Sequence, residues 1–472
     1  MLSKTNFLTY LDAPLHLWAQ VHHQLEAQPR SAYAEFLAQQ GQAVEILAKE
    51  YLEQVVLSGK DHLHLEWQDT FDDGRFQIRA DALIRDEKAN VYDLYEIKSA
   101  TSVQKIHVYD LAFQVLLLET LLPLRHAYLL HIDKTYRHGR QLDLEGFFIL
   151  ENASERVSPL RDEVTQLRES AWGVTLMAEP GPTLACTKPS ACPCPDLCHP
   201  NLPQNPIYNL PYLGKKARNL RVMGILAIED IPPDYNLSPT QQLHQKAVRS
   251  GQPIINFPAI QEALATLQYP LYFLDYETFN PAIPFFQGYQ PYEHIVFQYS
   301  LFVVQEPNAE PLHFDALIAD GSDPAPSIVP HLLEHICDVG SVVVWNKAFE
   351  ESRNKDLARH CPADADRLLG INDRLYDLMR IFKDGLFIHP LFKGSASLKA
   401  VLPVLCPELS YANLAIPDGE SAMLTWYQLH TGAIPPAERD ESITAMKIYC
   451  KMDTYGMVAI WKQLCTLLND ED

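Results

Sequence analysis

The chain has 472 residues, 47% of them hydrophobic and 21% charged, which is the composition of a globular protein with two or three domains. Its mean hydropathy is −0.14. The most apolar stretch, residues 111–131, is interrupted by Gln114, Glu119, Pro123 and Arg125. We therefore expect no membrane span and, because no apolar leader opens the sequence, a cytoplasmic protein.

The formal net charge of −22 disfavours a nucleic-acid partner, because phosphate backbones bind basic surfaces. Overall charge, however, describes solubility and not the field inside one cleft. Metal-dependent nucleases gather carboxylates at their centres, and a bound cation reverses the local field. The acidity therefore lowers the expectation of DNA binding without removing it.

The first part of the chain alternates helical and strand patterns. The predicted helices are 6–19, 31–56 and 107–122, and the predicted strands are 75–85, 90–99 and 126–132. This order predicts an α/β core. Between about residues 179 and 235, prolines and cysteines dominate, which indicates a compact irregular module followed by a linker.

A second α/β part begins near Tyr269. Its predicted strands are 270–279, 294–304 and 341–346, and its predicted helices are 347–360, 375–383, 397–405, 420–430 and 443–468. The expected domains are 1–177, a cysteine module at 178–205 that closes the first domain, a linker at 206–265, and a second domain at 266–472.

Charged residues interrupt the apolar strands of the first part. Glu96 and Lys98 are two residues apart in one predicted strand and share a face, and Asp81 in the preceding strand can meet them. Two carboxylates can hold Mg²⁺ or Mn²⁺, and a lysine beside them can position water or stabilise a phosphate. The following helix presents Asp110 and Gln114 on one side. The alternative is an ordinary Glu–Lys pair on a surface hairpin.

The stretch YEIKSATSVQKIHVYDLAFQ resembles the RecB-like exonucleases of the PD-(D/E)xK superfamily, some of which carry an iron–sulfur cluster. The resemblance implies a restriction-endonuclease-like fold with a metal ion held by Asp81 and Glu96. It assigns to Gln114, and more weakly to Tyr136, a contact with the DNA backbone near that metal. Glu45 lies where such enzymes often add a metal ligand, although many of them have His there.

Four of the nine cysteines, Cys186, Cys192, Cys194 and Cys198, lie in one proline-rich segment. Their spacing, C-x5-C-x-C-x3-C, lets four thiolates hold zinc or a [4Fe–4S] cluster. RecB-like nucleases with clusters take one cysteine from an N-terminal helix, and here Ala13 stands at that place, so Cys194 is the expected substitute. Iron–sulfur, zinc and a segment that has lost its metal all remain open.

A second set of carboxylates lies in the later part of the chain. Asp275 and Glu277 share one face of an apolar strand, and two like charges there are unfavourable without cations between them. Glu350 follows a later strand in the first turn of a helix. Tyr449 and Asp453 are four residues apart on a helix and point to the same neighbour. The four carboxylates together can hold two Mg²⁺ ions.

The ordered motifs D-x-E, WN-x-x-FE and Y-x3-D resemble those of the DEDD 3′–5′ exonucleases, which have a ribonuclease H-like fold. The resemblance implies that Tyr449 orients an attacking water. Glu350 departs from the pattern, because the middle motif usually ends in Asp. Lys393 and Lys399 lie on either side of a predicted helix start, where a phosphate can bind.

The stretches CTKPSACPCPDLC, FLDYETF, PFFQGYQPYEHIVFQYS and GSASLKAVLP are similar to bacterial proteins that carry domain of unknown function 2779 (DUF2779). That resemblance covers nearly the whole chain and implies a RecB-like nuclease joined to a ribonuclease H-like domain. We expect a metal-dependent exonuclease acting on DNA ends, preferably single-stranded, in repair or defence. The alternatives are an RNA exonuclease, a small-molecule phosphohydrolase, and a nucleic-acid-binding scaffold with one or both sites inactive. The sequence gives no indication of protein partners, which stay unknown at this point.

Overall fold

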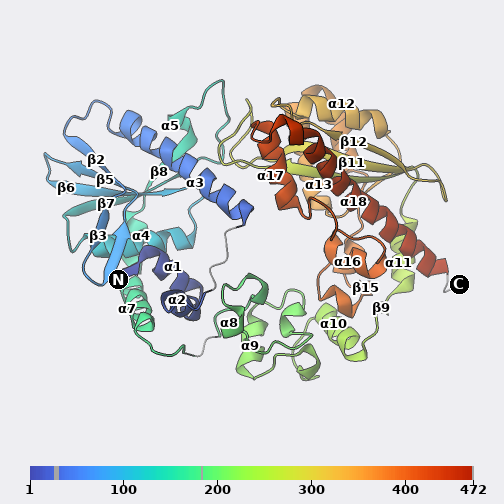
Figure 1. The fold of residues 1–472 in the computed structure, drawn as a ribbon, viewed down its shortest axis with the longest axis horizontal. Helices are drawn as coiled ribbons and strands as arrows, with labels where there is room; N and C mark the ends of the chain where they lie inside the picture. The colour runs from blue at the N-terminus through green and yellow to red at the C-terminus, as the bar shows by residue number, and fades with distance from the viewer. Residues whose placement is uncertain (26–30, 182–183, 470–472) are drawn as a thin grey trace. The chain divides into compact units, whose positions relative to one another are not determined.

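The structure is a computed structural model that describes residues 1–25, 31–181 and 184–469 (Figure 1). It is a mixed α/β structure with several sheets, as the sequence predicts. In the described parts of the chain, no helix combines the length and apolar character that crossing a membrane requires.

The chain forms two compact units. The first comprises Met1–Asn201 and also Pro281–Tyr292, and the second comprises Leu202–Asn280 and Glu293–Asp472. Residues 281–292 follow the strand of the second acidic set in the sequence, yet they pack in the first unit, where Ala282 is fully buried.

The first unit is built on a five-stranded sheet with the order β2-β5-β6-β7-β8. These strands are β2 Leu63–Trp67, β5 Ala82–Asp86, β6 Val91–Lys98, β7 Leu124–Ile132 and β8 Phe148–Asn152. Strands β6 and β7 are parallel and are joined by helix α4 (Lys105–Leu118), whereas the other neighbours are antiparallel. A smaller sheet contains β1 (Leu2–Ser3), β4 (Phe76–Arg79) and β3 (Thr70–Asp72).

The two faces of the larger sheet are covered by different helices, α3 (Ala32–Tyr51) and α4 (Figure 1). Because side chains alternate along a strand, Tyr95 and Ile97 of β6 face the α3 side and Leu94 faces the α4 side. Glu96 and Lys98 have the same parity as Leu94, so they also project toward α4. The remaining helices of this unit are α1 Lys4–Asp12, α2 Pro14–Val21, α5 Leu144–Phe147, α6 Ser154–Val157, α7 Arg161–Thr175 and α8 Pro195–Cys198.

Two predicted elements of the first unit are each divided in the structure. The predicted helix 6–19 breaks at Ala13, which is extended (φ −158°, ψ 134°) because the following Pro14 disfavours helical geometry in the residue before it. The predicted strand 75–85 separates into β4 and β5, which belong to different sheets. Asp81 lies at this junction and is outside both strands.

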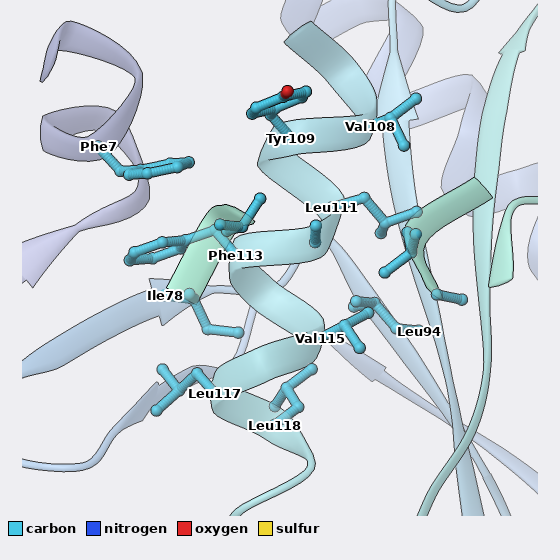
Figure 2. Packing of buried hydrophobic residues seen from close by; sticks show 14 of the residues in the cluster. Phe7, Ile78, Leu94, Val108, Tyr109, Leu111, Phe113, Val115, Leu117 and Leu118 are labelled. Atoms are coloured by element: carbon cyan, nitrogen blue, oxygen red, sulfur yellow. The ribbon is translucent and has the colours of Figure 1, made fainter. Parts of the chain in front are cut away.

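Helix α4 is the centre of the core of the first unit. Phe113 is fully buried and stacks on Phe7 of α1, with ring centroids 4.8 Å apart (Figure 2). Phe76 of β4 meets the edge of the same ring at 5.9 Å. These contacts fix α4, which carries Asp110 and Gln114, relative to α1 and to β4 of the smaller sheet.

We predict that Phe113→Ala destabilises the protein by about 3–5 kcal/mol, because it leaves a cavity between α1, α4 and β4. Chemical denaturation followed by fluorescence and circular dichroism measures this loss. The matched control is Ile106→Ala on the same helix, where the side chain is 39% exposed and the expected change is within about 0.5 kcal/mol. Equal stability of Phe113→Ala and the native protein would contradict the packing described.

The second unit contains a five-stranded sheet with the order β12-β11-β10-β13-β14. Its strands are β10 Leu271–Phe279, β11 Ile295–Val304, β12 Leu312–Leu317, β13 Ser341–Val344 and β14 Leu375–Asp377. Neighbours are antiparallel from β12 to β10 and parallel from β10 to β14. The predicted helix 375–383 is therefore wrong in its first half, because Leu375 extends the buried sheet before α15 (Arg380–Lys383) begins.

Helices cover both faces of this sheet. Leu271 and Phe273 pack with α16 (Leu398–Leu405) and α18 (Pro436–Asn469), and Leu274 packs on the opposite face. The helices on that opposite face are α12 Ala325–His335, α13 Lys347–His360 and α14 Ala365–Asn372. The same alternation places Asp275 and Glu277 on the α18 face.

Residues 206–265, which the sequence analysis treats as a linker, contain regular structure. The elements here are α9 Lys215–Val222, α10 Pro239–Ser250, β9 Ile254–Ile255 and α11 Phe257–Ala265. Strand β9 pairs with β15 (Phe387–Ile388), and a small core surrounds the fully buried Ile207 and Leu220. Helix α17 (Gly419–His430) completes the unit.

Candidate functional site

The buried carboxylate Glu96 is the centre of the acidic group in the first unit. It is 1% exposed, and Lys98 Nζ lies 2.7 Å from its Oε1. The same ammonium lies 2.6 Å from Asp110 Oδ2, and Gln114 Nε2 donates to Glu96 Oε2 at 2.7 Å and to Asp110 Oδ1 at 3.1 Å. Asp81 accepts a hydrogen bond from the Ile97 N–H at 2.9 Å. The structure therefore brings together the predicted Asp81, Glu96, Lys98 and Gln114.

A second lysine, which the sequence analysis does not identify, completes this group. Lys4 Nζ lies 2.9 and 3.1 Å from the two oxygens of Glu96 and 3.6 Å from Asp81 Oδ1. Lys4 is the first residue of α1, where a positive charge opposes the helix dipole. That unfavourable placement is the one local signal in the sequence that Lys4 has a distant partner.

Burial and mutual repulsion set the charge of the three carboxylates. Burial and the neighbouring Glu96 carboxylate raise the pKa of Asp81 to about 7 and that of Asp110 to about 6. Burial opposes ionisation of Glu96 as well, but the ammonium groups of Lys98 and Lys4 outweigh it and lower the pKa of Glu96 below its ordinary value. Of the three carboxyl groups, Glu96 therefore loses its proton most readily.

Two other residues predicted for this site have different partners. Glu45 on α3 accepts a hydrogen bond from Gln68 at 3.0 Å. The Tyr136 hydroxyl accepts one from the Asp143 N–H at 3.1 Å, and its ring packs against the edge of Phe147.

The cysteine segment folds onto α2 and forms a group that can hold a metal ion. One ligand atom from each of His16, Cys186, Cys192 and Cys198 lies within 4.8 Å of the other three. His16 Nε2 is 3.4 Å from Cys192 Sγ, and its Nδ1 is 2.7 Å from Asp12 Oδ2. A carboxylate on the second ring nitrogen is the usual way to orient a histidine ligand.

Cys194 lies beside this group, with its sulfur 3.7 Å from that of Cys198. Buried Ala13, which stands where the family resemblance implies a cysteine, packs in the same cluster. The N-terminal helices therefore offer the side chain of His16, three residues after Ala13. His16 was not predicted from the sequence, because it is 176 residues away from Cys192 and only the folded chain brings the two together.

We predict that His16→Ala and Cys192→Ala each remove most of the bound metal, because each leaves three of the four ligands. Iron and zinc are measured by mass spectrometry after anaerobic purification of the full chain. Cys337→Ala and His64→Ala, which change exposed residues of the same types, keep the native content. Full metal content in His16→Ala together with loss in Cys194→Ala would identify Cys194 as the fourth ligand instead.

The second unit brings its four predicted carboxylates together. Ligand atoms of Asp275, Glu277 and Cys450 lie within 4.8 Å of one another. Burial raises the pKa of Asp275 and of Glu350, and repulsion adds to it, from Asp453 on Asp275 and from Asp275 and Glu277 on Glu350. All four carboxylates are therefore electrostatic neighbours. Asp275 and Glu277 lie on one face of β10, because side chains alternate along a strand. Glu350 comes from the first turn of α13, and Asp453 comes from α18.

Hydroxyl groups and one lysine surround this acidic set. The hydroxyl of Tyr411 donates to Asp453 Oδ1, and the ring of Tyr449 lies 6.4 Å from that of Tyr411, measured between the ring centres. Lys399 Nζ lies 5.4 and 5.5 Å from the centres of these two rings and donates to the carbonyl of Pro417 at 3.1 Å. Tyr411 was not considered in the sequence analysis, and it comes from a loop with no motif to mark it.

Two carboxylate oxygens near this set have no hydrogen-bond partner. Glu350 Oε2 and Asp377 Oδ1 are both buried and unpartnered, and Glu350 is 2% exposed. No described lysine or arginine forms an ion pair with Asp275, Glu277, Glu350 or Asp453, and Lys399 and Arg353 act on members of the set only at longer range.

Burial, followed by mutual repulsion, raises the pKa of Asp275, Glu277 and Glu350 well above the ordinary carboxyl value. The folded protein therefore keeps protons that the unfolded chain loses near pH 4, at about the ordinary carboxyl pKa. In the absence of a cation, stability falls as the pH rises from that value through the raised pKa values.

We predict that Asp275→Asn raises the melting temperature of the chelator-treated protein at pH 8, because it removes one charge from the repelling set. The gain shrinks as the pH falls toward 4. Glu306→Gln, a change at an exposed residue of the same unit, leaves the melting temperature unchanged at both pH values. A lower melting temperature for Asp275→Asn at pH 8 would contradict the assigned repulsion.

One protein family matches part of the second unit. Residues 272–397 match the family described as Domain of unknown function (DUF2779). This match supports the predicted resemblance to that family over these residues, which are fewer than the nearly whole chain expected from the sequence. The matched residues run from within β10 to the residue before α16 and include Asp275, Glu277 and Glu350.

Curated relatives also match parts of the chain. The chain is 26% identical over 218 residues to "Uncharacterized protein MG366" of Mycoplasma genitalium, and 27% identical over 207 residues to its homolog in Mycoplasma pneumoniae. These regions are 42% and 40% of this chain but 32% and 31% of the relatives, so the chain spans about a third of their length. "Uncharacterized protein UU173" of Ureaplasma parvum is 28% identical over 136 residues, 25% of this chain and 20% of that protein. No solved structure matches the chain.

Proposed function

We propose that the second unit is a metal-dependent nuclease that hydrolyses phosphodiester bonds at nucleic-acid ends, with DNA as the expected substrate. The observation that carries this proposal is the meeting of Asp275, Glu277, Glu350 and Asp453 without a basic ion-pair partner among the described residues. A folded protein can keep several carboxylates so close together when bound cations neutralise their charge.

The residues present fit a divalent cation. The donors are carboxylate oxygens, which Mg²⁺ and Mn²⁺ prefer, and Glu350 Oε2 is buried without a partner. Asp275, Glu277, Glu350 and Asp453 would hold the ions. When bound, a pair of such ions would activate water and stabilise charge on a phosphodiester.

The chain's own side chains around the acidic set suit the same reaction. Tyr449 is buried on the same helix as Asp453, four residues before it, and its hydroxyl can orient a water molecule. Lys399, whose ammonium lies over the Tyr411 and Tyr449 rings, can attract a phosphate into an otherwise acidic site. The strand order, three antiparallel strands followed by two parallel ones, is compatible with the ribonuclease H-like fold that the motifs resemble.

For the first unit we propose a PD-(D/E)xK nuclease site of the RecB-like kind. Asp81 and Glu96 already share one cation, the Lys4 ammonium, which stands where a divalent ion would bind. Gln114 Oε1 is buried and has no hydrogen-bond partner, so it is available to a ligand. Lys98 is held by Glu96 and Asp110, so its charge has a fixed position for a phosphate or a water.

For the cysteine group we propose a structural metal centre that joins α2 to the end of the first unit. Three thiolates with His16 are a frequent zinc donor set, whereas four thiolates including Cys194 suit a [4Fe–4S] cluster. The metal analysis of the His16 and Cys194 variants distinguishes these two forms.

We predict that the full chain with Mg²⁺ or Mn²⁺ releases nucleotides from an end-labelled single strand of DNA. Asp275→Asn lowers the activity of the second unit by at least about 100-fold, and Lys98→Ala lowers that of the first unit by a similar factor. The reason is that each variant lacks a group that would act on the reacting phosphate or its metal ion. Product length on a denaturing gel is the measurement, with labelled RNA and a small phosphodiester as competing substrates.

Glu306→Gln and Lys88→Ala change exposed residues and serve as matched controls with native activity. Loss of activity in one variant only identifies the unit that hydrolyses this substrate. Nucleotide release that survives Asp275→Asn and Lys98→Ala together would contradict both assignments. Tight binding of the strand without any hydrolysis would instead identify a nucleic-acid-binding scaffold.

A further inference from the structure

We propose that Lys4 is an internal cation that holds Asp81 and Glu96 together in the metal-free protein and leaves them when a divalent cation binds. The inference rests on the nuclease site proposed for the first unit and adds a residue that its motifs do not contain. Lys4 is a positioning residue in this proposal, because it acts through the two carboxylates.

The position of the ammonium is the first argument. Lys4 Nζ lies 2.9 and 3.1 Å from both oxygens of Glu96 and 3.6 Å from Asp81 Oδ1, so it occupies the space between the two carboxylates. Mg²⁺ binds carboxylate oxygens at about 2.0–2.1 Å. A divalent ion that used both carboxylates would lie against the ammonium, and the two positive charges would repel.

The placement of Lys4 in its helix is the second argument. Ser3 caps α1 with a reciprocal hydrogen-bonded pair to Asn6, and Lys4 follows at the first helical position. A lysine there opposes the helix dipole, so helix formation does not favour it. The attraction that keeps its side chain inward comes from Glu96 and Asp81.

The surroundings of Lys4 leave room for its side chain to move. Both lysines pair with two carboxylates, Lys4 with Glu96 and Asp81 and Lys98 with Glu96 and Asp110. Lys4, but not Lys98, lines a cavity of about 280 Å³, together with Ser3, Gln77 and Asp81. This cavity offers the Lys4 side chain a hydrated position after it leaves the carboxylates.

The first test is Mn²⁺ binding measured by electron paramagnetic resonance on the full chain. Every protein carries Asp275→Asn and Asp453→Asn, so that the carboxylates of the second unit do not contribute. We expect Lys4→Gln to bind Mn²⁺ at least about tenfold more tightly, because it removes a competing unit charge within about 4 Å. Lys105→Gln, at an exposed lysine of α4, keeps the affinity unchanged. Adding Asp81→Asn to Lys4→Gln abolishes the gain.

The second test needs no variant. Limited acetylation of the native protein, read residue by residue by mass spectrometry, modifies Lys4 slowly without metal because its ammonium is paired. We expect Mn²⁺ to accelerate acetylation of Lys4 several-fold and to leave that of Lys105 unchanged.

Asp81-dependent Mn²⁺ binding that is equal or weaker in Lys4→Gln, or Lys4 acetylation that Mn²⁺ does not accelerate, would overturn the inference and leave the proposed nuclease site intact. Mn²⁺ binding that is insensitive to Asp81 in every variant would overturn that site, and the inference with it.

Discussion

Charge neutralisation of buried carboxylates is the constraint that organises both units. A carboxylate removed from water is unfavourable unless a cation or several hydrogen-bond donors accompany it. The first unit meets this requirement from its own chain, since Lys4 and Lys98 accompany Glu96 and its neighbours. The second unit does not, because its acidic set has hydroxyl and thiol donors but no ion-pair partner among the described residues.

These two solutions imply different dependence on metal ions. A site neutralised by lysine is stable without a divalent cation, so an incoming ion must compete with the protein's own charge. A carboxylate site without counter-charge would gain stability from an ion, because the ion would replace protons that the raised pKa values retain. Under the nuclease function proposed above, the two units would therefore respond to different ranges of metal concentration.

The sequence predicts much of each site because its local periodicities carry over directly into geometry. The two-residue spacing of Glu96 and Lys98 and that of Asp275 and Glu277 place each pair on one face of a strand. The four-residue spacing of Tyr449 and Asp453 places both on one side of α18. Lys4 and His16 were not predicted, because Lys4 pairs with Glu96 at 92 residues' distance and His16 with Cys192 at 176. No local sequence pattern shows which residues so far apart will meet. The division of residues 75–85 between two sheets was missed for the same reason, since strand pairing is non-local.

The N-terminal helices α1 and α2 contact the hydrophobic core, the acidic group and the cysteine group of the first unit. Phe7 of α1 stacks on Phe113 of the core, Lys4 at the start of the same helix pairs with Glu96, and His16 of α2 meets the cysteines. A single extended residue, Ala13, separates the two helices. A metal ion held by His16 and the cysteines would therefore restrain α2, and through so short a joint it would also restrain the helix that delivers Lys4. The cysteine group and the acidic group thus contact the two ends of one short structural element, so a metal ion held by the proposed centre would also help to position the Lys4 charge.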